Sequence, residues 1–380
     1  MAATDSYAGG DGRLSPLSTP SATRAVLEAH GIGTKYTLGQ NFLVNDDVLK
    51  KIIALAEVGE NDRVLEVGPG IGTLTIALLK HAASVIAIER DPDLPAVLAD
   101  TLHPWREKFA LIEKDALDVT RDDIVAAMVE IGGDTGYPDR ASSAANETAQ
   151  WAVSQSEDCL SESGYPVAPP QEDLQLSLPS KLVANLPYAV AATVVLDYFE
   201  NFSFMDSATI MVQKEVADRM AAAVGTKNYG AYTVKLGLYA EPVGRFAVGP
   251  GNFFPPPRVD SAVIRLNRRV PLMADGAPAS PEVIAAAALM ADAAFTNRRK
   301  TIANSCKTYF SGRGPILLGV ADSSAAEGAP TIALPDGAAT AERLPAIFEA
   351  AAIDPRRRGE TLTQQEFLAL GAALLRVTAA

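Results

Sequence analysis

Three glycines at alternate positions, in the stretch EVGPGIG from residue 66 to residue 72, constrain this chain more than any other feature. They directly follow the apolar run RVLEV and precede a segment whose apolar residues have helical spacing. Glycine reaches positive φ angles and allows another backbone to approach closely, so the stretch predicts a tight turn between a buried strand and a helix. A β–turn–α unit of this kind is typical of α/β sheets.

Short apolar runs alternate with amphipathic segments along most of the chain. Strands are predicted at residues 63–67, 84–89, 109–114, 181–185 and 207–213, and helices after Asn45 and near residues 73–80, 92–102, 121–131, 191–200 and 214–223. Residues 231–248 and 259–267 predict further strands. This alternation predicts a Rossmann-like, doubly wound and mainly parallel α/β sheet.

Composition divides the chain into regions. Residues 1–22 lack the order of a signal peptide and predict a disordered tail, and residues 23–270 form the main domain. A segment at about 132–178, without helical or strand periodicity, interrupts that domain as an insertion. Residues 271–380 form a smaller helical domain, with a flexible Gly/Ala/Ser-rich segment at about 320–341.

The net charge of -13 would argue against a nucleic-acid partner if it were spread evenly. It is not, because residues 130–178 hold nine acids and one arginine. Residues 181–313 hold 15 basic and 10 acidic side chains. The insertion therefore carries much of the acidity, and the segment after it is basic enough to contact RNA.

Polar groups at the ends of successive strands indicate a nucleoside cofactor. Gly68 lies in the glycine turn, and Glu89 ends the next strand, where a carboxylate commonly accepts hydrogen bonds from ribose hydroxyls. Asp115 ends the third strand and could accept from an adenine amine, or it could simply cap a turn. Pro69 crowds the loop that would hold a pyrophosphate, which favours S-adenosylmethionine over a dinucleotide. A nicotinamide-dependent oxidoreductase is the alternative, although no His or Tyr constellation for hydride transfer is evident.

The fourth strand, KLVAN, ends in the motif NLPY: Asn185, Leu186, Pro187 and Tyr188. Its end should meet the same crevice as the first three strand ends. The amide oxygen of Asn185 and a backbone carbonyl could then hold the exocyclic amine of a nucleobase in line with a methyl donor. Tyr188 offers a face for a purine. An ordinary turn at the end of a strand is the alternative for this motif.

Cysteine and histidine are rare in this chain, which argues against several kinds of site. Cys159 and Cys306 are too few for a disulfide framework and suit a reducing cytoplasm, and with 3 His a metal centre is not expected. No run of about 18 apolar residues is present, so we expect no contact with a membrane. A cytoplasmic monomer without a bound metal is predicted.

Several motifs together resemble the ribosomal RNA small-subunit adenine dimethyltransferase family (the KsgA or RsmA group). They are LGQNFL (38–43), EVGPGIGTLT (66–75), IERD (88–91), NLPY (185–188), MVQKEVADR (211–219), NFFPPPRVDSAV (252–263) and AFTNRRKTIANS (294–305). The resemblance implies the class I methyltransferase fold and contacts to S-adenosylmethionine from Asn41, Leu43, Gly68, Glu89, Asp115 and Asn185. It also implies dimethylation of N6 of two adjacent adenines near the 3′ end of 16S rRNA, within the immature small ribosomal subunit.

Aromatic and basic residues in these motifs acquire roles under the same resemblance. Phe42, Tyr188 and Phe253 would stack on an adenine turned out of its helix, although Phe42 and Phe253 could equally be core residues. Arg298, Arg299 and Lys300, predicted on a helix, would contact RNA phosphates or form a solvated helix face.

The chain departs from the family pattern in two places. The residues after NLPY, AVAAT at 189–193, are more apolar than usual, and the acidic insertion is long. Two further alternatives stay open, a 23S rRNA methyltransferase of the macrolide-resistance type and a non-catalytic assembly factor of the small subunit.

Overall fold

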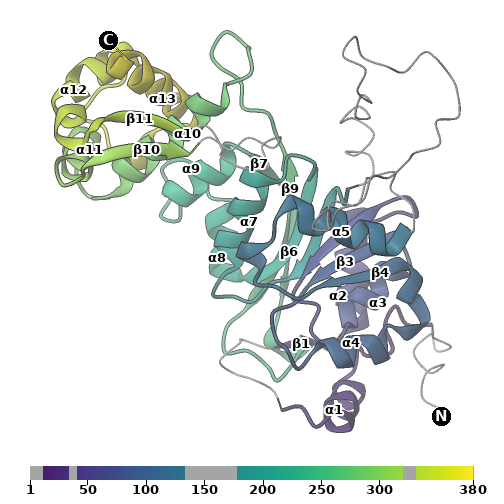
Figure 1. The fold of residues 1–380 in the computed structure, drawn as a ribbon. Coiled ribbons are helices and arrows are strands. Elements are labelled where there is room, and N and C mark those ends of the chain that lie inside the picture. The colour runs from purple at the N-terminus through teal and green to yellow at the C-terminus, as the bar shows by residue number, and fades with distance from the viewer. Residues whose placement is uncertain (1–11, 34–40, 133–177, 320–330, 380) are drawn as a thin grey trace, which may run out of the picture.

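The computed structural model describes residues 12–33, 41–132, 178–319 and 331–379, so nearly all of the predicted insertion, with Cys159, lies outside the described residues. Figure 1 shows a larger α/β domain and a smaller, mainly helical domain that carries the C-terminus. No helix among these described ranges is long and apolar enough to span a membrane.

A seven-stranded sheet forms the centre of the α/β domain, in the order β4-β3-β2-β5-β6-β9-β7. Its strands are β2 (Arg63–Val67), β3 (Ser84–Ile88), β4 (Phe109–Ile112), β5 (Lys181–Asn185), β6 (Ser207–Gln213), β7 (Ala240–Val248) and β9 (Ser261–Arg268). Neighbouring strands from β4 to β6 are parallel, and β9 is antiparallel to both β6 and β7. This mainly parallel sheet confirms the predicted fold class. Its parallel strands are recognisable in the sequence because burial on both faces makes them continuous apolar runs.

Helices cover both faces of the sheet, and successive strand residues point to opposite faces. Val64 and Val85 pack into a core with α2, α3 and α4 on one face. Leu65 and Ile86 pack into a second core with α5, α7 and α8 on the other face. These helices are α2 (Asp46–Ala56), α3 (Thr73–Leu79), α4 (Pro95–Thr101), α5 (Arg121–Gly132), α7 (Ala191–Asn201) and α8 (Lys214–Met220).

The C-terminal domain has its own apolar core, with Phe310, Ile347 and Phe367 at its centre. Its elements are α10 (Pro281–Phe295), α11 (Ile302–Ser311), β10 (Pro315–Gly319), β11 (Thr331–Asp336), α12 (Gly337–Ala350) and α13 (Gln364–Ala379). The antiparallel pair β10–β11 was not predicted, and residues 331–341 are strand and helix rather than a flexible segment. This pairing depends on contacts between segments that are separated in sequence, which local composition does not reveal. Residues 320–330 lie outside the described ranges.

Helix α9 (Ala231–Gly237) corrects a second prediction, since residues 231–248 were expected to form strands. The alternation of large side chains in AYTVKL favours a strand, but Val234 and Leu238 are both 0% exposed at helical spacing. The Thr233 hydroxyl also donates to the backbone oxygen of Arg219, at the end of α8. Tertiary packing therefore outweighs the local pattern here.

The N-terminal segment corrects a third prediction, because residues 12–22 are folded and not part of a disordered tail. Leu17 is 1% exposed in the core with α2 and α3, and helix α1 (Pro20–Ala29) begins inside the predicted tail. The polar composition of residues 1–22 does not reveal that Leu17 is buried, because its packing partners lie elsewhere in the chain. Residues 1–11 lie outside the described ranges.

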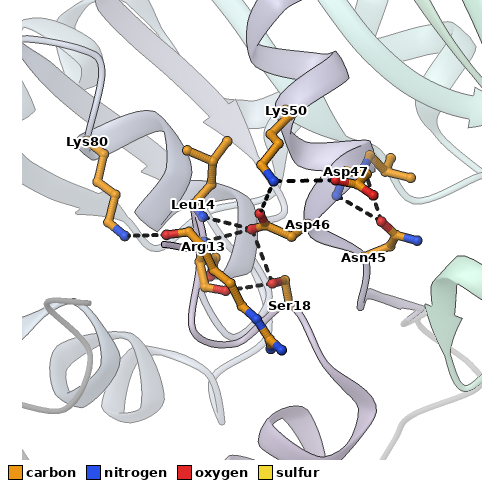
Figure 2. Close-up of polar contacts among 10 residues, drawn as sticks. Arg13, Leu14, Ser18, Asn45, Asp46, Asp47, Lys50 and Lys80 are labelled. Carbon is orange, nitrogen blue, oxygen red and sulfur yellow. Dashed lines mark hydrogen bonds and ion pairs between the residues drawn. The ribbon is translucent and has the colours of Figure 1, made fainter. Parts of the chain in front are cut away.

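Asp46, in the first turn of α2, holds this segment (Figure 2). Its Oδ1 accepts hydrogen bonds from the backbone N–H of Leu14 at 2.8 Å and of Ser15 at 3.2 Å. The Ser18 hydroxyl donates to the same oxygen at 3.3 Å. Lys50 pairs with the other carboxylate oxygen at 3.1 Å. One acid therefore fixes the N-terminal segment to α2.

We expect Asp46→Ala to lower the free energy of unfolding by about 1–3 kcal/mol, since it leaves partly buried backbone donors without a partner. Burial raises the pKa of Asp46, but hydrogen bonds from Lys50, Ser15 and Leu14 outweigh it, so the net pKa is lowered. Such a carboxyl stabilises the fold above its ordinary pKa and loses that contribution as the pH falls through its folded-state value. The difference between the two proteins should shrink below about pH 4, as measured by denaturant unfolding at several pH values.

Asp47→Ala is the matched control, because Asp47 is the next residue on α2 and its side chain is 82% exposed. It should change stability little. An equal loss in both variants would contradict the role given to Asp46.

Candidate active site

The glycine turn lies at the point where the strand order of the sheet reverses, between β2 and β5. Ligands of doubly wound sheets bind at such switch points, beyond the carboxyl ends of the strands. Gly68, Gly70 and Gly72 have φ values of +71°, +61° and +90°. A Cβ on Gly70 would lie 3.1 Å from the Phe42 ring. The turn therefore needs glycine for its backbone conformation and for the close approach of Phe42.

A cavity opens at this switch point and collects residues from four strand ends. Gly68, Glu89, Asp115 and Asn185 all line it, as the sequence predicts. Its empty volume of about 1050 Å³ includes space open to solvent. A cavity with a few convergent polar groups at this place in an α/β sheet is the candidate ligand site of the chain.

Glu89 directly follows β3, at the rim of the cavity. Its Oε1 accepts hydrogen bonds from the backbone N–H groups of Arg90 and Asp91, both at 2.9 Å. Burial raises the pKa of Glu89, and the backbone donors of Asp91 and Arg90 oppose that shift. The carboxylate is therefore held in one orientation, which suits a fixed contact to ribose hydroxyls.

Asp115 has a partner that the sequence did not predict. Its Oδ2 pairs with Arg90 at 2.8 Å, and its Oδ1 accepts from the backbone N–H of Leu117 at 3.1 Å. The Leu117 hydrogen bond and the Arg90 guanidinium lower the pKa of Asp115. Asp115 therefore caps a short turn and also lines the cavity, and its contact to an adenine amine stays a prediction.

The Asn185 carboxamide lies at the cavity and is tied to the segment before β1. Its Nδ2 donates to the backbone oxygen of Asn41 at 3.2 Å. Within the described residues its Oδ1 accepts no hydrogen bond, so this oxygen can accept one from a ligand. Asn41 and Leu43 line the same cavity.

The rest of the NLPY turn is fixed by neighbouring strands. The Leu186 N–H donates to the Met211 oxygen at 3.1 Å, and the Leu186 side chain is 1% exposed in the core. The Tyr188 hydroxyl lies 2.6 Å from the Ser261 hydroxyl, and burial raises the pKa of Tyr188. All four residues of the turn line the cavity.

Phe42 and Phe253 lie on the two strands of a small antiparallel sheet, β1 (Phe42–Leu43) and β8 (Phe253–Phe254), in which Phe42 pairs with Phe254 and Leu43 with Phe253. They are 6% and 3% exposed. Phe42 lines the cavity, whereas Phe253 packs into the core behind it. Phe253 thus takes the core position that the sequence left open.

The basic triplet of Arg298, Arg299 and Lys300 lies in the turn between α10 and α11, not on the predicted helix. Arg298 donates to the backbone oxygens of Tyr229 and Thr226 and pairs with Glu360 at 2.8 Å. The side chains of Arg299 and Lys300 are exposed and make no hydrogen bond or ion pair within the described part of the chain. Arg298 is therefore a structural residue, and the other two are available to a partner.

Glu66 is a cavity residue that the sequence analysis did not single out. It lies near the end of β2, is 1% exposed and lines the cavity, and its Oε2 has no hydrogen-bond partner among the described residues. Burial raises the pKa of Glu66 to about 8. The sequence could have indicated a buried Glu66, because an acid inside the apolar run RVLEV must be buried together with that run. No group of three or more His, Cys, Asp or Glu side chains suited to a metal occurs in the ranges that the structure describes.

The chain is similar to several known proteins. A family model described as ribosomal RNA adenine dimethylase matches residues 33–329. The chain is 32% identical over 361 residues to ribosomal RNA small subunit methyltransferase A of Geobacillus sp. (strain WCH70), an alignment that covers 95% of this chain and 98% of that protein. It is also 32% identical to the protein of the same name from Staphylococcus aureus (strain Newman), over 93% of this chain and 94% of that one.

Two solved structures share the fold at 20% identity. The dimethyladenosine transferase from Plasmodium falciparum has a TM-score of 0.53, over 87% of this chain and 95% of that chain. The 23S rRNA methyltransferase ErmE has a TM-score of 0.50, over 88% of this chain and 99% of that chain. These similarities establish the α/β fold but not the RNA that is modified.

Glu66→Gln should remove a pH dependence of stability. The ordinary pKa of 4.5 rises to about 8 in the folded chain. Between these values the unfolded chain has lost the proton and the folded chain keeps it, so stability falls as the pH rises. One pKa unit corresponds to about 1.4 kcal/mol, so the wild type should lose up to a few kcal/mol relative to the variant between about pH 5 and 8. Thermal or denaturant unfolding across this range measures the difference, and parallel curves for the two proteins would contradict it.

Proposed function

The chain belongs to the ribosomal RNA adenine dimethylase family and is an rRNA adenine dimethyltransferase, and we propose that its substrate is the 16S rRNA of the small ribosomal subunit. The proposed reaction transfers two methyl groups from S-adenosylmethionine to N6 of each of two adjacent adenines near the 3′ end of that RNA. It would act on the immature subunit in the cytoplasm, as a monomer and as a step of subunit biogenesis.

One observation carries the catalytic part of the proposal. The Asn185 carboxamide lies in the cavity next to the glycine turn, with its nitrogen engaged by Asn41 and its oxygen available. A hydrogen-bond acceptor fixed at this place suits the amino group of a nucleobase. The motif therefore does more than end a strand.

The cavity residues fit S-adenosylmethionine. Gly68 and Gly70 line the cavity where the methionine portion would bind, and Glu89 has the orientation needed for the ribose hydroxyls. Asp115 could accept from the adenine amine beside Arg90, and Asn41 and Leu43 complete the wall. When bound, this cofactor supplies a methyl group on a positively charged sulfur.

Asn185 and the NLPY backbone position the acceptor nitrogen. The lone pair of an adenine amine is delocalised into the ring, so the nitrogen is a poor nucleophile. Hydrogen bonds from its two N–H groups to Asn185 Oδ1 and to a backbone carbonyl of the turn would align the lone pair with the methyl group. Tyr188 would stack on the purine. No general base is required, because the nitrogen loses its proton readily to water once it is methylated.

The C-terminal domain would position the RNA. Arg299 and Lys300 are exposed cations in the turn after α10, and contacts to phosphates fix orientation without reading sequence. The exposed Arg356 and Arg358 lie in a loop whose backbone accepts hydrogen bonds from Ile302 and Ala303, so a second set of basic residues lies beside the first. Arg356 pairs with Asp354 and Arg358 with Glu360, so these two charges are partly neutralised. The helical domain with the motif NRRKTI favours the small subunit over the 23S rRNA alternative.

Asn185→Ala should reduce methyl transfer about 100-fold or more, because the acceptor nitrogen loses its alignment. Transfer of tritium from labelled S-adenosylmethionine to undermethylated small subunits measures the rate, and mass spectrometry of the 16S rRNA fragment identifies the product. Asn201→Ala is the matched control, since Asn201 is exposed at the end of α7 and its side chain bonds Asp197 on the same helix.

The outcomes separate the alternatives. No incorporation by the wild type would refute the enzyme, and incorporation into 23S rRNA would favour the macrolide-resistance type. Intact subunit binding and assembly with Asn185→Ala would indicate an assembly role that does not need catalysis. Normal methylation by that variant would contradict the role given to Asn185.

Replacing Arg299 and Lys300 together by alanine should weaken binding to the small subunit. The slope of log K against log salt should fall by roughly one for each phosphate that the variant no longer neutralises. Binding of S-adenosylmethionine should not change. Arg106→Ala, which removes a 65% exposed cation on the α/β domain, is the control. Equal binding by the double variant and the wild type across salt concentrations would contradict the proposed phosphate binding.

A further inference from the structure

The motif NFFPPPRVDSAV contains a residue that the proposed function leaves without a role. Ser261 is the first residue of β9, and β9 runs antiparallel to β6. The start of an antiparallel strand lies at the same edge of a sheet as the carboxyl ends of its parallel neighbours. Ser261 pairs in register with Gln213, the last residue of β6, so it lies at the edge where the cavity opens.

Among the described residues, the Ser261 hydroxyl makes one side-chain hydrogen bond, to Tyr188. It lies 2.6 Å from the Tyr188 hydroxyl, and either group can donate the hydrogen bond. Ser261 is 0% exposed and is not among the residues that line the cavity. It therefore cannot touch a bound base or cofactor, and any effect on the reaction must pass through Tyr188.

Tyr188 is otherwise the least restrained residue of the NLPY turn. Asn185 is tied to Asn41, Leu186 is fixed by Met211 and by the core, and Pro187 packs against Gly68. The Tyr188 side chain is only partly buried and lines the cavity. The bond to Ser261 is the one hydrogen bond that its side chain makes within the described ranges.

We propose that Ser261 is a positioning residue of the methyl transfer, which holds the Tyr188 ring at the angle at which its face meets the flipped adenine. The proposal deepens the proposed function and depends on it. A phenol fixed at its hydroxyl and at its backbone keeps one orientation, so the purine stacks on a preformed surface. Without the anchor, the ring loses that orientation and a partly buried hydroxyl loses its partner.

The test compares Ser261→Ala, Tyr188→Phe and the double variant. Each single variant removes one side of the same hydrogen bond and keeps the aromatic ring. We expect each to lower kcat about tenfold, with little change in the Kd of S-adenosylmethionine, because the free energy of one buried hydrogen bond corresponds to roughly that factor. The double variant should be no slower than either single variant, since the two changes act through one bond.

A binding measurement follows the stacking itself. We place 2-aminopurine at the target position of a 16S rRNA fragment and measure its fluorescence. Stacking on Tyr188 should quench this fluorescence in the wild type, and the quenching should be weaker in Ser261→Ala and Tyr188→Phe. This readout does not depend on methyl transfer, and a merely structural role of Ser261 would not change it in properly folded protein.

Ser207→Ala is the matched control. Ser207 is also a buried serine at the first position of a strand, but it pairs with Asn267 at the opposite edge of the sheet. It should leave kcat and quenching unchanged. Wild-type kcat in Ser261→Ala, or effects of the single variants that multiply in the double variant, would overturn the proposal. Absence of methylation by the wild type would instead refute the proposed function.

Discussion

The site depends on the close approach of two backbone turns, the glycine turn after β2 and the NLPY turn after β5. A Cβ on Gly68 would lie 3.5 Å from Pro187 Cδ and 3.8 Å from the Asn185 backbone oxygen, at a φ of +71°. The space alone would admit a methyl group, so it is the left-handed backbone conformation that requires glycine. β2 and β5 are adjacent because the chain returns across the sheet after β4, and this return creates the crevice.

The parallel part of the sheet could be predicted well from the sequence, because burial on both faces leaves a continuous apolar run. β2, β5 and β6 have the predicted bounds. The errors lie where a distant contact decides the structure. Residues 12–22 are held by Asp46, α9 by its packing against α8 and α10, and β11 by its pairing with β10. None of these partners can be inferred from local composition.

The candidate site was predictable to the same extent. Four predicted residues share one cavity because each follows or ends a parallel strand: Gly68, Glu89, Asp115 and Asn185. The succession of these strands along the chain can be deduced from the alternation of apolar runs and amphipathic segments. The pair of Asp115 with Arg90, the burial of Glu66 and the bond of Tyr188 to Ser261 depend on side-chain directions or on an antiparallel strand. Patterns of residue types indicate which groups meet, but not how they are restrained.

The internal contacts of Arg298 distinguish it from Arg299 and Lys300, although the three basic residues look equivalent in the sequence. Its guanidinium joins the turn after α10 to the Thr226–Tyr229 loop and to Glu360, while Arg299 and Lys300 extend into solvent. Substitutions at position 298 should be limited by the need to fold. Those at positions 299 and 300 should be limited by binding to a partner. Substitutions at Arg299 and Lys300 can then change the affinity for an RNA partner without disturbing the contacts that Arg298 makes inside the protein.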